Sequence, residues 1–247
     1  MAITALVALA GCGAGTAAGG GPTDGTVTVF AAASLTESFT RIGQDFEAAH
    51  RGTTVVLNFA GSAALAAQIN QGAPADVFAS AATRNMATVT EAGNADGDPV
   101  IFVRNQLVVA VPKGNPRGVA GLADLARPGV KVALCAEQVP CGAAARTALD
   151  AASVALTPVT LEQDVRGALS KVRLGEVDAA LVYRTDALAA AADVTAVEFG
   201  ESARAVNDYP IVALRDAPNP DGARAFVAYV RSERGRAVLT AAGFQAP

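Results

Sequence analysis

The sequence predicts an α/β protein built of two lobes. From residue 26 to the end of the chain, apolar runs typical of buried strands alternate with stretches of helical periodicity, which is the pattern of α/β architecture. The pattern restarts near residue 110, after which comes the loop Lys113-Gly-Asn-Pro116, so two lobes are expected. With 247 residues, 51% of them hydrophobic and 17% charged, the chain is long enough to build a substantial core.

The expected strands are short apolar runs, and the expected helices carry one apolar face. The strands are 26–32, 53–59, 77–80, 106–112, 130–134, 179–183, 194–199 and 209–214. The first helix follows the first strand and presents Leu35, Phe39, Ile42 and Phe46 on one face. The later helices are 62–71, 83–92, 142–151, 165–174 and 221–242, the last of them broken near Ser232.

The charge pattern argues against nucleic acid as a partner. The formal net charge is −4, and the Lys and Arg residues are scattered singly, so no basic stripe exists to displace counterions from a phosphate backbone. An acidic protein can still bind an anion where local dipoles build the site, so net charge does not decide the ligand.

The N-terminal segment indicates export and lipidation. Residues 1–11 form an apolar stretch too short to span a membrane, and Leu9-Ala10-Gly11-Cys12 resembles the lipobox of bacterial lipoproteins. We therefore expect Cys12 to carry the lipid and residues 13 to about 25 to form a tether. No Lys or Arg precedes Arg41, so the basic region of a signal is missing; a start codon further upstream would supply it. A plain apolar tail is the alternative.

Lipidation of Cys12 would leave Cys135 and Cys141 as a pair with five residues between them. In an exported protein such a pair favours a disulfide. The alternatives are a redox pair and a metal site. The spacing is not that of a Cys-x-x-Cys redox motif, and the single histidine, His50, lies far off in the sequence.

Two serines stand where a predicted strand ends and a helix begins. They are Ser34, in Phe30-Ala-Ala-Ala-Ser34-Leu35, and Ser62, in Phe59-Ala-Gly-Ser62-Ala63. A helix N-terminus presents unpaired N–H groups and a positive dipole end, so two such hydroxyls indicate a shared oxyanion pocket. The structural alternative is a capping box over Ser34-Leu-Thr-Glu37, in which serine and glutamate satisfy each other's backbone N–H groups.

Two further helix starts and one strand end add candidate donors. Val139-Pro-Cys-Gly142 precedes the helix 142–151, and Asp164 is a suitable N-cap for the helix that begins at Val165. The strand 179–183 ends in Tyr183, a neutral hydrogen-bond donor on a rigid ring. Taken singly, each is also explained as a cap or a core residue.

Together these motifs resemble the molybdate-binding proteins of ABC importers, within the type II periplasmic-binding-protein superfamily. The resemblance runs from about residue 27 to 244 and depends on the order and spacing of its motifs. They are Ala31-Ala-Ala-Ser34-Leu35, Phe59-Ala-Gly-Ser62, Gly72-Ala-Pro-Ala-Asp-Val-Phe78, Val139-Pro-Cys-Gly142, Asp164-Val-Arg166, Leu181-Val-Tyr183 and Tyr209-Pro-Ile211.

The resemblance implies a Venus-flytrap fold, in which two lobes close on a ligand about two hinge crossings near residues 103–112 and 205–210. It implies a signal, lipobox and tether over 1–25, a first lobe from 26–105 and 210–247, and a second lobe from 106–209. The C-terminal helix would return to the first lobe.

The resemblance also implies a ligand set for an oxyanion, molybdate or tungstate. The donors would be the hydroxyls of Ser34 and Ser62, the backbone N–H groups of Cys141 and Val165, and the hydroxyl of Tyr183. No direct metal-ion ligand, cofactor or catalytic residue is implied. The protein would be a lipid-anchored, extracytoplasmic monomer that serves an ABC permease and is not an enzyme.

The chain departs from the family pattern at Cys141, where alanine is usual, and at Ala82, where an acid is common. Neither change affects the expected ligand set, because the contact at Cys141 is through the backbone and Ala82 concerns a helix cap.

The expected donors suit a fully ionised oxyanion. Helix starts before Leu35, Ala63, Gly142 and Val165 would nominally offer about two positive charges, at about half a charge each. Neutral donors of this kind would disfavour protonated phosphate, whose O–H needs an acceptor. The alternatives are sulfate, thiosulfate or another oxyanion as the ligand, an enzyme with Cys141 as an activated thiolate, and a lipoprotein with a structural role only.

Overall fold

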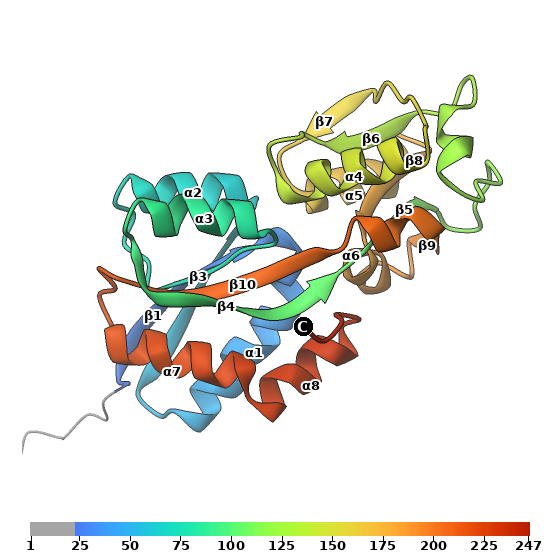
Figure 1. The fold of residues 1–247 in the computed structure, drawn as a ribbon. Helices are drawn as coiled ribbons and strands as arrows, with labels where there is room; N and C mark the ends of the chain where they lie inside the picture. The colour runs from blue at the N-terminus through green and yellow to red at the C-terminus, as the bar shows by residue number, and fades with distance from the viewer. Residues whose placement is uncertain (1–22) are drawn as a thin grey trace, which may run out of the picture.

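The protein folds into two α/β lobes, each built on one five-stranded sheet (Figure 1). The structure is a computed structural model that describes residues 23–247, so the predicted lipidation site Cys12 and most of the tether lie outside the described residues. The predicted fold class, a two-lobed α/β architecture, is confirmed.

The first lobe contains both ends of the described chain. Its elements are β1 (Gly25–Ala32), α1 (Thr36–Ala49), β2 (Thr53–Ala60), α2 (Ser62–Asn70), β3 (Val77–Ala79), α3 (Thr83–Glu91), β4 (Ala95–Asn105), β10 (Asn207–Leu214), α7 (Pro220–Arg231) and α8 (Glu233–Ala241). The sheet order is β2-β1-β3-β10-β4, with β1 parallel to β2 and β3, and β10 antiparallel to both of its neighbours. A short 3-10 turn, η1 (Ala33–Leu35), joins β1 to α1.

Helices cover both faces of this first sheet (Figure 1). The predicted apolar face of α1 packs on one side with α7 and α8, where Phe39 and Phe46 are fully buried and make edge contacts with Phe226. The other face is covered by α2 and α3 through residues such as Leu65 and Met86. The predicted break in the last helix is confirmed at Ser232, whose hydroxyl caps α8 by accepting the N–H of Gly235.

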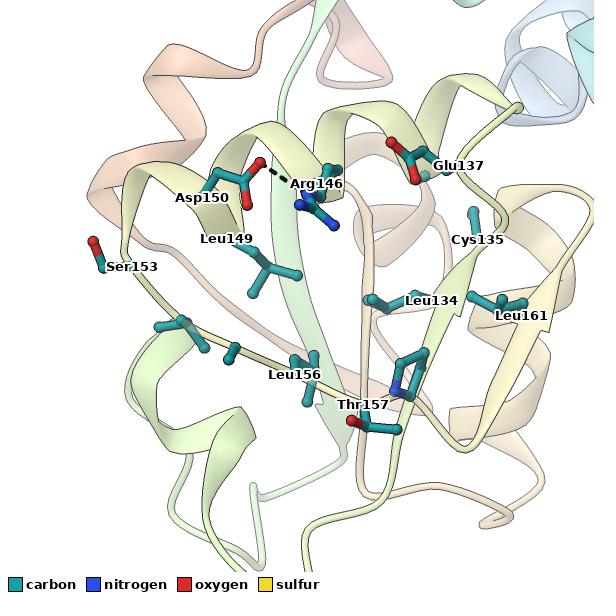
Figure 2. Close-up of a pocket in the computed structure, with 14 residues that line it drawn as sticks. Leu134, Cys135, Glu137, Arg146, Leu149, Asp150, Ser153, Leu156, Thr157 and Leu161 are labelled. Atoms are coloured by element: carbon teal, nitrogen blue, oxygen red, sulfur yellow. Dashed lines mark hydrogen bonds and ion pairs between the residues drawn. The ribbon is translucent and has the colours of Figure 1, made fainter.

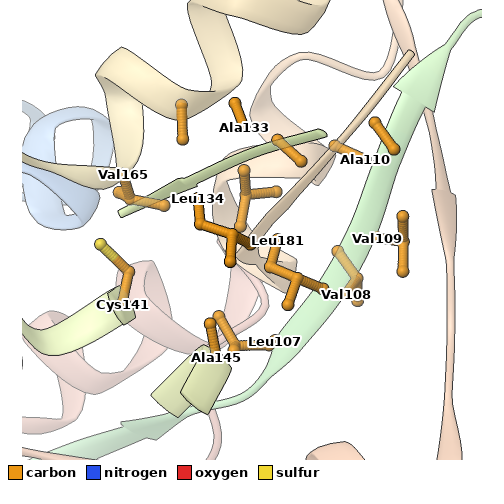
Figure 3. Close-up of a cluster of buried hydrophobic side chains, with 14 of the residues drawn as sticks. Leu107, Val108, Val109, Ala110, Ala133, Leu134, Cys141, Ala145, Val165 and Leu181 are labelled. Atoms are coloured by element: carbon orange, nitrogen blue, oxygen red, sulfur yellow. The ribbon is translucent and has the colours of Figure 1, made fainter. Parts of the chain in front are cut away.

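The second lobe repeats the arrangement. Its elements are β5 (Leu107–Pro112), η2 (Leu122–Ala126), β6 (Val132–Cys135), α4 (Pro140–Ala151), β7 (Thr160–Glu162), α5 (Val165–Arg173), β8 (Ala179–Tyr183), α6 (Arg184–Ala189), β9 (Val194–Val197) and η3 (Gly200–Arg204). The sheet order is β7-β6-β8-β5-β9. Figure 3 shows the core of this lobe, into which the side chains of Cys141 and Val165 are packed with Leu134 and Leu181.

The chain crosses between the lobes twice. The first crossing is at Gln106, between β4 and β5, and the second lies between η3 and β10. The two crossing strands pair with each other, because Asn207 of β10 is in register with Asn105 of β4. The end of the chain joins them: the backbone groups of Gln245 and Arg104 exchange two hydrogen bonds of 2.9 Å. The hinge is therefore a ribbon of two paired strands, with Gln245 bonded to the β4 strand of that ribbon.

Candidate functional site

All five predicted ligand residues line one small cavity between the lobes. The space open to the centre of a water molecule there is about 20 Å³, which leaves room for one compact guest roughly 3 Å in radius. The lining residues are Ala32, Ala33, Ser34, Gly61, Ser62, Ala81, Val139, Pro140, Cys141, Asp164, Val165 and Tyr183. The lining thus brings together strand ends and helix starts from both lobes.

Ser34 lies at the end of β1, inside the 3-10 turn that precedes α1. Its side chain is buried, and its Oγ is 2.8 Å from the hydroxyl of Tyr209. The capping box with Glu37 is wrong, because the turn places Ser34 within a helical segment, where its side chain makes no capping hydrogen bond. Glu37 instead forms an ion pair with Arg166 of the second lobe. The Ser34 hydroxyl is therefore available to the cavity.

Ser62 is the first residue of α2, and Gly61 is the N-cap. The Ser62 Oγ accepts a hydrogen bond of 3.0 Å from the backbone N–H of Ala81, two residues after β3 ends. Because this bond uses the oxygen as an acceptor, the hydroxyl proton remains free to be donated. The residue is almost completely buried, so a partner for that proton has to come from the cavity.

The first turn of α4 leaves the Cys141 amide without a backbone acceptor among residues 23–247. Pro140 has no N–H, and the amides of Gly142 and Ala143 both donate to the carbonyl of Val139. The side chain of Cys141 is packed into the lobe core, so only the backbone of this residue can serve a ligand. An unpaired N–H at a helix N-terminus is a ready donor for an anion.

The start of α5 presents a second such amide. Asp164 is the N-cap, as predicted, and its Oδ1 accepts the N–H of Gly167 at 3.0 Å. The amide of Ala168 donates to the carbonyl of Asp164, which leaves Val165 at the first helical position without a backbone acceptor within the described chain. Like that of Cys141, its side chain is buried in the lobe core.

Tyr183 closes the cavity from the end of β8. It is 1% exposed, and within residues 23–247 its hydroxyl has no hydrogen-bond partner. Burial, followed by the nearby Tyr209, raises the pKa of Tyr183 well above its ordinary value, so the phenol keeps its proton. An unpartnered buried donor is costly unless something fills the cavity and accepts from it.

The predicted disulfide between Cys135 and Cys141 is present. It ties the end of β6 to the first turn of α4, the turn that carries the Cys141 amide. A disulfide sulfur has no thiolate form, so the geometry gives no support to the alternative in which Cys141 is a nucleophile.

The lobes touch on several sides of the cavity. Arg84 of α3 reaches across to the second lobe and donates to the carbonyls of Glu137 and Val139, at 2.7 and 3.0 Å. These carbonyls belong to the loop that leads into Cys141. Arg84 was not predicted from the sequence, because nothing near it in the chain marks a contact with a segment more than fifty residues away. The structure is that of a closed cleft.

Among residues 23–247, no basic side chain lines the cavity, and the one carboxylate that does, Asp164, already caps α5. The positive potential comes instead from the N-termini of α2, α4 and α5, which meet there with the turn before α1. Within residues 23–247, no cluster of three or more His, Cys, Asp or Glu side chains is arranged to hold a metal ion. No helix in that range is long and apolar enough to cross a membrane.

A larger pocket of about 660 Å³ opens in the second lobe beside α4 (Figure 2). Leucine side chains make up much of its wall, and its one arginine, Arg146, is paired with Asp150 at 2.8 Å. The carboxylate of Glu137 lies at its rim. With its arginine neutralised and two carboxylates present, this pocket does not suit an anion, so the small cavity between the lobes is the candidate site.

Comparison with known proteins identifies the family to which the chain belongs. Residues 27–245 match the family model for bacterial extracellular solute-binding proteins. The chain is 45% identical to the molybdate-binding protein ModA of Mycobacterium tuberculosis, over all of this chain and 95% of that protein.

Two solved structures have the same fold. The periplasmic molybdate-binding protein of Azotobacter vinelandii matches with a TM-score of 0.78 and 21% identity, over 90% of this chain and 99% of that one. The sulfate-binding protein SubI of Mycobacterium tuberculosis matches with a TM-score of 0.75 and 20% identity, over 90% and 86%. These likenesses support the fold, and the match along the sequence shows that the chain belongs to the bacterial extracellular solute-binding protein family.

Proposed function

We propose that this protein captures molybdate outside the cytoplasm and delivers it to the permease of an ABC importer. The observation that carries the proposal is the set of five donors around one closed cavity: Ser34, Ser62, Cys141, Val165 and Tyr183. Each can present an N–H or O–H group to a guest, and the described part of the chain places no Lys or Arg side chain in the wall.

The chemistry of this wall matches a fully ionised tetrahedral oxyanion. Such an ion accepts hydrogen bonds on every oxygen and donates none, so it can use all five donors at once. The converging helix N-termini offset its charge without an arginine. The guest radius of roughly 3 Å, taken from the cavity, also suits one small oxyanion better than a larger organic ligand.

The choice of molybdate over sulfate as the ligand rests on the related sequences and not on the fold. The relative at 45% identity is named for molybdate, whereas the fold is shared with a sulfate-binding protein at 20% identity. Tungstate has the same charge and shape as molybdate, so we propose it as a second ligand. Uptake would involve closure of the two lobes about the crossings at Gln106 and Ala205-Val206.

We also propose that the protein acts as a monomer tethered by a lipid on Cys12, with no catalytic step and no cofactor. Labelling of the expressed protein with palmitate tests the tether. The lipid should be incorporated by the native chain and not by the Cys12→Ala variant, and equal labelling of both would refute the assignment.

The ligand is tested by calorimetric titration and thermal unfolding of residues 23–247 with molybdate, tungstate, sulfate and phosphate. We expect one site per chain, and stabilisation of about 2.7 kcal/mol at a ligand concentration one hundred times Kd. Ser62→Ala should weaken binding, whereas Ser170→Ala, which removes an exposed hydroxyl on α5, should not. Binding of sulfate alone would show that sulfate, and not molybdate, is the ligand. Binding of no oxyanion would refute the proposed function.

A further inference from the structure

Tyr209 lies outside the cavity wall and directly behind Ser34. It belongs to β10, close to the second crossing, and its side chain is fully buried. Its ring packs edge-on against Tyr183, with ring centres 5.9 Å apart, and against Phe244 at 5.5 Å. One residue of the hinge ribbon therefore contacts a ligand residue from each lobe, Ser34 and Tyr183.

The direction of the hydrogen bond between Tyr209 and Ser34 is fixed by Asn105. The side-chain oxygen of Asn105 accepts the N–H of Gln106 at 2.9 Å, which turns its NH₂ group toward the Thr185 hydroxyl at 2.9 Å and the Tyr209 hydroxyl at 3.5 Å. An amide NH₂ group donates and cannot accept. The Tyr183 hydroxyl is also near, but its geometry makes no hydrogen bond within residues 23–247, so the Tyr209 proton is assigned to Ser34 Oγ, at 2.8 Å.

Tyr209 keeps the proton that this arrangement requires. Burial raises the pKa of Tyr209 well above the ordinary value of a phenol, so the hydroxyl stays neutral at any physiological pH. Ser34 Oγ thus accepts from Tyr209, and its own proton is left to point into the cavity. Ser62 Oγ likewise accepts, from the N–H of Ala81, so its own proton is also left for the cavity.

We propose that Tyr209 is a positioning residue that holds Ser34 as a hydrogen-bond donor and so selects fully deprotonated oxyanions over protonated ones. The proposal rests on the proposed function, because it concerns how that site treats its ligand. With both serine oxygens already accepting from the protein, a ligand O–H, such as that of hydrogen phosphate, finds no acceptor at either serine. Without the Tyr209 hydroxyl, Ser34 is free to turn and accept.

A double-mutant cycle between Tyr209→Phe and Ser34→Ala tests this, with affinities measured by calorimetry. In the native background, Tyr209→Phe should weaken molybdate binding by about 3- to 10-fold. In the Ser34→Ala background the same change should have no further effect, because the group through which Tyr209 acts is gone. Tyr229→Phe, a half-buried tyrosine on α7 whose ring packs on Phe46, is the matched control and should bind as the native protein does.

Competition by phosphate near neutral pH provides a second readout that a purely structural role would not change. Phosphate should displace molybdate more readily from Tyr209→Phe than from the native protein. An equal loss of affinity in both backgrounds, or unchanged phosphate competition, would overturn the positioning role while leaving the proposed function intact. If the native protein binds sulfate instead, the cycle is run with sulfate; if it binds no oxyanion, both proposals are overturned.

Discussion

Gly61 offers a direct test of whether binding depends on closure of the two lobes. A Cβ added at Gly61, the N-cap of α2, would lie 2.3 Å from the backbone carbonyl oxygen of Gln163 in the second lobe. Real Cβ contacts are essentially never shorter than 3.0 Å, so in the closed state Gly61→Ala must part the lobes by about 1 Å at this point. The φ of −59° at Gly61 is ordinary for alanine, so the first lobe itself should fold unchanged.

The expected cost follows from the donors that the second lobe supplies. A hydrogen bond of normal length that is stretched by about 1 Å is no longer a hydrogen bond. Cys141, Val165 and Tyr183 all line the cavity from the second lobe, the lobe to which Gln163 also belongs. Loss of even one bond to a charged ligand costs about 1.5–3 kcal/mol, so we expect molybdate to bind about 10- to 150-fold more weakly.

Calorimetry gives the affinity, and small-angle X-ray scattering gives the shape. The radius of gyration of the native protein should fall when molybdate is added, and that of Gly61→Ala should fall less. Gly200→Ala is the matched control, since a Cβ there meets nothing within 4 Å. Native affinity and full contraction in Gly61→Ala would refute the reasoning, as would a large drop in Tm of its ligand-free form.

Three other perturbations test a buried carboxyl group, the disulfide and an ion pair between the lobes. Burial, and then the Glu37 carboxylate, raise the pKa of Asp186 to about 8. The folded state therefore holds a proton that the unfolded state releases near its ordinary pKa, and stability should fall by about 1.4 kcal/mol per pH unit between about 4 and 8. Chemical denaturation of Asp186→Asn should lack this slope, and an unchanged slope would contradict the assignment. Replacing Cys135 and Cys141 together by serine should lower Tm by about 5 °C, because the disulfide closes a short loop worth about 2 kcal/mol. Molybdate affinity should stay within a few-fold, since the donor is the amide; its complete loss would show that the disulfide holds the site. Arg166→Gln breaks a half-exposed ion pair with Glu37 between the lobes and should weaken binding by about 5-fold at most. As salt is raised, the molybdate affinity of the native protein should fall toward that of the variant. A difference in affinity that persists at high salt would contradict a screened surface pair.

The sequence predicted the fold well where local pattern decides it. The apolar face of α1, the cap at Asp164 and the break at Ser232 each depend on residues within a few positions of one another. β4 was missed because Gly97-Asp-Pro99 has the composition of a turn. The structure accommodates Pro99 in an edge strand, at a place where the register with β10 shifts. β7 and α6 were missed as well; they span three and six residues, too few for a clear period.

The candidate site, like the fold, could be predicted where it depends on residues close together in the sequence. Ser34, Ser62 and Tyr183 stand at strand ends that the pattern locates, and the structure places all three on one cavity. The hydrogen bond between Tyr209 and Ser34 could not be predicted, because the two residues are 175 positions apart and no local pattern assigns the Tyr209 hydroxyl a partner. The capping box was a sound local pattern, but the 3-10 turn before α1 changed the geometry on which it depends.

Gln245 lies at the crossing where the lobes would move relative to one another. Its backbone pairs with that of Arg104, and its side chain donates to Gln106. Figure 1 shows this part of the structure beside β4. A fluorophore attached at residue 247, two positions beyond Gln245, would therefore lie close to the pivot and report opening and closing in real time. For the same reason, a bulky group attached at residue 247 would hinder movement of the two crossing strands and alter measured binding rates.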